Sequence, residues 1–73
     1  MANAVTYCTT RRELEERGWF LTSRLSSLTA RLMRLIGRDP QAFVDVRNEC
    51  RDTRQEITVS HRELRDHRRA HGC

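Results

Sequence analysis

Mostly apolar residues recur at alternating steps of three and four along the chain, and this pattern predicts two long amphipathic helices. The first repeat runs through Tyr7, Arg11, Leu14, Gly18, Leu21, Leu25, Leu28, Leu32 and Leu35. The second runs through Phe43, Val46, Cys50, Thr53, Ile57, Ser60, Leu64, His67 and His71. Such repeats are typical of helices that pack side by side with interlocking side chains.

A turn separates the two repeats. Gly37 directly follows the first apolar run, where helices commonly close with a residue in the left-handed conformation. Asp39 can cap the next helix, and Pro40 suits its first position because no N–H is needed there. The first helix has two candidate starts, Thr6 and the capping-box pattern at Thr10. We therefore expect one domain, residues 1–73, made of a helix over about 7–36, a turn at 37–39 and a helix over about 40–71.

The short connection requires the two helices to be antiparallel neighbours. Counting outward from the turn places Leu28 opposite Cys50 and Gly18 opposite Ser60. In the second of these pairs, two small residues face each other. Charged residues beside the apolar repeat pair in the same alignment, with Arg17, Arg24 and Arg31 opposite Glu63, Glu56 and Glu49. The predicted fold is all-α, an antiparallel two-helix hairpin of the coiled-coil type.

A second stripe with heptad spacing lies beside the leucine repeat of the first helix and contains no charged residue. Its members are Trp19, Thr22, Ser26, Thr29, Met33 and Ile36. The second helix cannot cover this stripe, because it is occupied by the leucine repeat. We expect the stripe to be a homodimer interface, with first helix against first helix and a four-helix bundle as the product.

The open end of the hairpin collects side chains that bind metals or form disulfides. His67 and His71 are one helical turn apart, and Cys8 and Cys73 are expected at a similar height. These residue types are the usual ligands of zinc, which gives a metal-binding module as one alternative function. A Cys8–Cys73 disulfide and a frayed end without either feature are the other interpretations, and we favour the frayed end with no metal or cofactor.

All fourteen basic residues are arginines, and the net charge is +4. The arginine-rich first helix therefore makes nucleic-acid binding a second alternative. The expected Glu partners of these arginines and the lack of a basic tail or of an aromatic stacking surface disfavour it. Catalysis is also disfavoured, because His61 beside Glu15 is accompanied by no nucleophile or pocket.

Two helices bury only one stripe each, so a chain of 73 residues with this fold is near the lower limit of independent stability. No apolar stretch is long enough to cross a membrane, and no signal peptide is apparent. We expect a soluble cytoplasmic protein. Its expected function is that of a non-enzymatic interaction or structural module that self-associates and has a further protein partner still to be identified.

Overall fold

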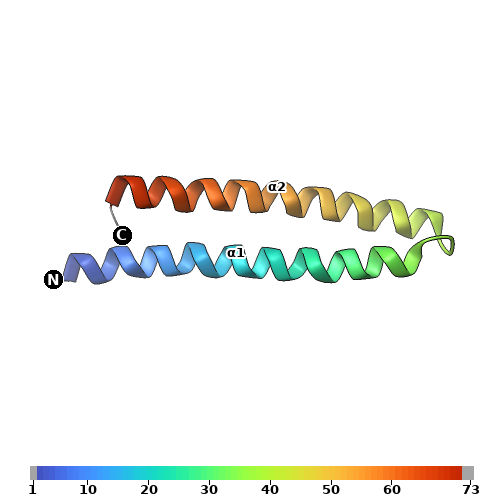
Figure 1. Ribbon diagram of the computed structural model, residues 1–73, viewed down its shortest axis with the longest axis horizontal. Helices are drawn as coiled ribbons and strands as arrows, with labels where there is room; N and C mark the ends of the chain where they lie inside the picture. Colours follow the sequence, from blue (N-terminus) through green and yellow to red (C-terminus); the bar gives the residue numbers. More distant parts are fainter. Residues whose placement is uncertain (1, 72–73) are drawn as a thin grey trace.

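The computed structural model consists of two long antiparallel helices that lie side by side and pack against each other (Figure 1). Helix α1 spans Ala2–Leu35, and helix α2 spans Pro40–His71. The structure describes the backbone of residues 2–71 and the side chains of residues 9–70, and this part of the chain contains no strand. The prediction of an all-helical hairpin is confirmed. Helix α1 begins at Ala2, before either expected start, and ends at Leu35, so that Ile36 belongs to the turn.

The turn has the conformation that its residues favour. Gly37 has a φ of +73°, and the Arg38 N–H donates to the Leu35 carbonyl at 3.0 Å. The Asp39 carboxylate then accepts a hydrogen bond from the Ala42 N–H at 3.1 Å, as an N-cap does. The chain thus closes one helix and opens the next within a few residues, which brings the end of α2 back beside the start of α1 (Figure 1).

The buried core follows the two predicted repeats. Every residue that is buried in the described part of the chain belongs to them: Leu21, Leu28, Val46, Cys50, Thr53 and Ser60. Leu28, Val46 and Cys50 form one cluster, against which Leu25, Leu32 and Leu35 pack. At the Gly18 layer, a Cβ built on the glycine would lie 3.7 Å from the Ser60 Oγ, so these two small residues do face each other. The hairpin is narrow, about 57 Å long and 15 Å wide.

Two glycine substitutions should have opposite effects on stability. Gly37→Ala should lower the free energy of unfolding by about 1 kcal/mol, because a left-handed residue with a Cβ is strained. Gly18→Ala should leave it unchanged or raise it by up to about 1 kcal/mol, since alanine favours a helix and its Cβ meets Ser60 at an ordinary distance. Urea unfolding at one fixed protein concentration measures both. An unchanged stability in Gly37→Ala would contradict this account of the turn, and a loss of about 1 kcal/mol in Gly18→Ala would contradict the account of the contact between Gly18 and Ser60.

Candidate interaction surface

The charged residues beside the core differ between the two sides of the hairpin. On one side, Arg17 donates to the Glu63 carboxylate at 3.2 Å, as the helix alignment predicts. Both side chains are about half exposed, so this ion pair contributes no more than about 1 kcal/mol.

The ion pairs expected further along the same side are absent. Among the described residues, neither Arg24 nor Arg31 has an acidic group within 4.0 Å, so their expected pairing with Glu56 and Glu49 is wrong for this structure. Holding two long exposed side chains in one geometry costs conformational entropy that water-screened attraction barely offsets. Heptad spacing brings the two columns of charge near each other but does not oblige each pair to close.

The other side of α1 carries the uncharged stripe, here called the uncharged face: Trp19, Thr22, Ser26, Thr29, Met33 and Ile36. All of its side chains are exposed, and α2 covers none of them. Trp19, Met33 and Ile36 are 67%, 64% and 57% exposed. These are among the most exposed large apolar side chains of the hairpin, and they share one face with no charged residue between them.

The polar groups of this face are partly satisfied within α1. The Thr22 hydroxyl donates to the Gly18 carbonyl at 2.9 Å, and the Thr29 hydroxyl donates to the Leu25 carbonyl at 2.8 Å. A threonine whose donor is used in this way presents mainly its methyl group to a neighbour. Covering the uncharged face would therefore leave neither of these donors without a partner, and burial would cost less than the composition of the face suggests.

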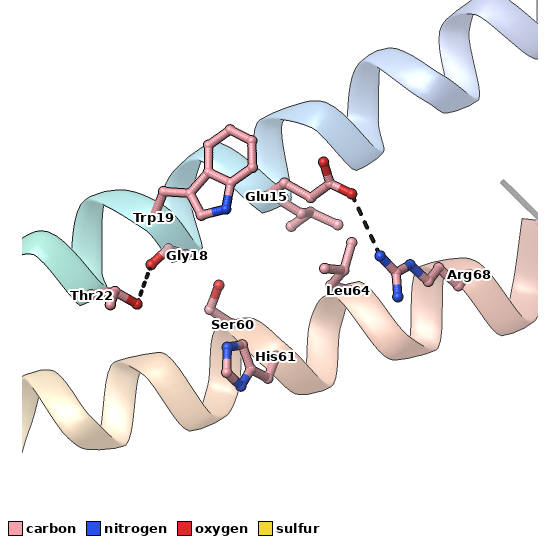
Figure 2. Close-up of a pocket in the computed structure, with 9 residues that line it drawn as sticks. Glu15, Gly18, Trp19, Thr22, Ser60, His61, Leu64 and Arg68 are labelled. Carbon is pink, nitrogen blue, oxygen red and sulfur yellow. Dashed lines mark hydrogen bonds and ion pairs between the residues drawn. The ribbon is translucent and has the colours of Figure 1, made fainter.

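Helix α2 borders the uncharged face with positive charge. Arg47, Arg54, His61 and Arg68, here called the arginine row, are spaced seven residues apart and are all exposed. Arg68 reaches across to Glu15 of α1 at 3.5 Å, on the side of α1 that carries Trp19 (Figure 2). The acidic column of Glu49, Glu56 and Glu63 lies on the opposite flank of α2, where Glu63 meets Arg17.

The arginine row was not predicted from the sequence. Arginines and acidic residues are almost equal in number along the second half of the chain, and this hides their separation onto two flanks of α2. The spacing of seven residues was the signal that could have revealed it.

A hollow of about 300 Å³ lies between the two helices at the Gly18 layer. Leu14, Gly18, Ser60 and Leu64 line it between the helices, and Trp19 and His61 stand at its edge (Figure 2). The hollow exists because glycine faces serine at a layer where neighbouring layers hold larger side chains. It opens on the side of the hairpin that carries the uncharged face and the arginine row.

Most of the residues predicted as candidate metal ligands or disulfide partners have side chains outside the described part of the chain. The side chains of His71, Cys8 and Cys73 lie outside the described residues, and only His67 of the four is described, half-buried. Within residues whose side chains are described, no group of three or more His, Cys, Asp or Glu is close enough to hold a metal ion. Cys50 is a free buried thiol in the core.

The expected proximity of His61 and Glu15 does not produce a pair. Glu15 is bound instead by Arg11 at 3.1 Å and by Arg68 at 3.5 Å. The guanidinium groups bring a permanent charge and several donors to the carboxylate, and they reach it from both helices.

Comparison of the chain with protein-family models, with curated proteins and with solved structures finds no match. No helix in the described part of the chain is long and apolar enough to cross a membrane.

If the interpretation of a frayed end is correct, replacing Cys8 and Cys73 by serine should be nearly neutral for the free energy of unfolding in reducing buffer, because such an end contributes little to global stability. The measurement is urea unfolding with and without a reductant, together with metal analysis of protein purified without an affinity tag. A loss of stability seen only without reductant would reveal a disulfide. Stoichiometric zinc that disappears in His67→Ala would reveal a metal site.

Proposed function

We propose that this chain is a non-enzymatic interaction module, a coiled-coil hairpin that self-associates through the uncharged face of α1. The observation that carries the proposal is the exposure of Trp19, Met33 and Ile36 on one face without charge. Large apolar side chains scattered singly on a surface are ordinary, but a continuous uncharged stripe of them is typical of a contact surface.

The total exposed area of the hairpin is consistent with a surface that a partner covers. A compact monomer of this mass, 8.6 kDa, is expected to expose about 4,700 Å². The hairpin exposes 5668 Å², roughly 1,000 Å² above that expectation. A stable protein interface buries about 800 Å² on each partner, so one partner on one face would bring the exposed area to the ordinary value.

The uncharged face can pair with itself. In an antiparallel contact between two copies of α1, Ser26 and Thr29 lie at the centre, and Trp19 lies toward Ile36 of the second copy. Small residues at the centre let the two backbones approach, while large apolar residues at the ends fill the space between them. The product is a dimer with four helices, whose subunits each contribute one hairpin.

The interface prediction compares two double variants that add the same charge. Trp19→Glu with Met33→Glu should weaken the dimer by more than about 100-fold, because each change removes an apolar contact and buries a charge without a partner. Phe20→Glu with Val59→Glu should leave the dimer intact, since Phe20 and Val59 are also exposed, 65% and 42%, but lie off the uncharged face. Light scattering or sedimentation gives the molar mass, and circular dichroism reports whether the variants stay helical.

Should the charged variant unfold, Met33→Gln alone provides a milder test of the same contact. Wild-type mass in both Trp19→Glu/Met33→Glu and Met33→Gln, or equal dissociation of the two double variants, would contradict the proposed interface.

A further inference from the structure

One side of the hairpin combines two surfaces of different chemistry. The uncharged face of α1 and the arginine row of α2 run beside each other, with the hollow at Gly18 and Ser60 between them (Figure 2). Arg47 and Arg54 have no acidic group within 4.0 Å among the described residues. A partner that covered only the uncharged face would leave the arginine row uncovered beside it.

A second copy does not match both surfaces. When two α1 helices pair antiparallel through the uncharged face, the two-fold axis also places α2 beside α2 of the second copy. Counting from the turn, Arg47 of one copy then lies at the height of Arg54 of the other, and both rows point toward the middle. Unpaired arginines in the centre of a closed four-helix bundle are strongly unfavourable. The self-associated form must therefore stay open on this side.

We propose that this side of the hairpin binds a third helix from a partner protein, with an apolar stripe against α1 and a row of acidic residues against α2. The inference rests on the contact face named in the proposed function, but not on self-association, because it assigns a different occupant to that face. Carboxylates at seven-residue spacing would match Arg47 and Arg54, whose guanidinium groups can bind carboxylates through two parallel hydrogen bonds, whereas Arg68 already binds Glu15. A leucine or phenylalanine of the third helix would fill the hollow beside Gly18.

A protein helix accounts for the observations better than a nucleic acid does. A phosphate backbone would satisfy the arginine row, but it would leave Met33 and Ile36 in water beside it. Binding of single strands relies on aromatic side chains on which bases stack, and Trp19 is the only aromatic residue on the uncharged face. An amphipathic helix with an acidic edge covers both surfaces at once and competes with the second copy for α1.

Two synthetic helical peptides test the inference against the full chain. Each has about 25 residues, enough for a stable amphipathic helix, with leucine at heptad positions a and d. One carries glutamate along the adjacent column, and the other carries lysine there. The glutamate peptide should bind about tenfold more tightly in low salt, as two exposed ion pairs with Arg47 and Arg54, compared with repulsion of lysine, allow. The difference should shrink in about 1 M salt, where charges are screened beyond about 3 Å. The complex should contain one hairpin and one peptide.

A pair of variants with the same net charge separates the arginine row from general attraction to a basic protein. Arg47→Gln with Arg54→Gln should abolish most of the preference for the glutamate peptide. Arg24→Gln with Arg31→Gln removes the same charge from the opposite flank, beside Glu56 and Glu49, and should preserve the preference. Circular dichroism checks that both variants remain helical.

Each result decides a separate question. Equal affinity for the two peptides, or equal loss of preference in the two variants, would overturn the acidic third helix. Binding of a DNA duplex that is lost only in the Arg47/Arg54 variant, without peptide discrimination, would overturn it in favour of a nucleic acid. A wild-type mass of one chain with intact peptide discrimination would refute self-association and leave this inference standing.

Discussion

The left-handed turn at Gly37 determines which residues meet anywhere else in the structure. Its φ of +73° lets α1 stop at Leu35, and the Asp39 cap lets α2 start at once. A connection this short permits only antiparallel neighbours, and it sets the alignment of the two repeats from the closed end. Leu28 therefore meets the Cys50 layer and Gly18 meets Ser60 far from the turn. A longer or freer loop would leave the alignment to weak surface charges.

The core that this alignment creates is small. Only four hydrophobic side chains are buried in the described part of the chain, and the other two buried residues there are Thr53 and Ser60. The small and polar side chains of Thr53 and Ser60 make less apolar contact in the core than leucine would at the same positions. A two-helix unit with such a core gains much of its stability from whatever covers its second face. Folding and association are for this reason closely linked in the proposed function.

Two features could be predicted from the sequence: the turn, which depends on adjacent residues, and the buried positions, which follow the heptad repeat. The turn follows from Gly37, Asp39 and Pro40, and the buried residues follow from the heptad. The start of α1 was placed too late, since no strong cap precedes Thr6 and a helix can extend until its tertiary contacts end. The Arg24 and Arg31 pairs failed because spacing sets proximity and not the conformer of an exposed side chain. The arginine row was missed because the seven-residue spacing was followed only along the flank of α2 that carries Glu49, Glu56 and Glu63.

Apolar surface and charge have different consequences for partner choice on this hairpin. In the proposed contact, the uncharged face would supply most of the buried area and would accept any helix with a suitable apolar stripe, a second copy included. The arginine row adds little affinity, because each of its side chains is exposed, but it disfavours a partner with positive charge along the same edge. Discrimination between two partners depends on the difference between their binding free energies and not on the size of either one. If the hairpin self-associates as proposed, this charged border would let it exchange its own copy for a better-matched helix.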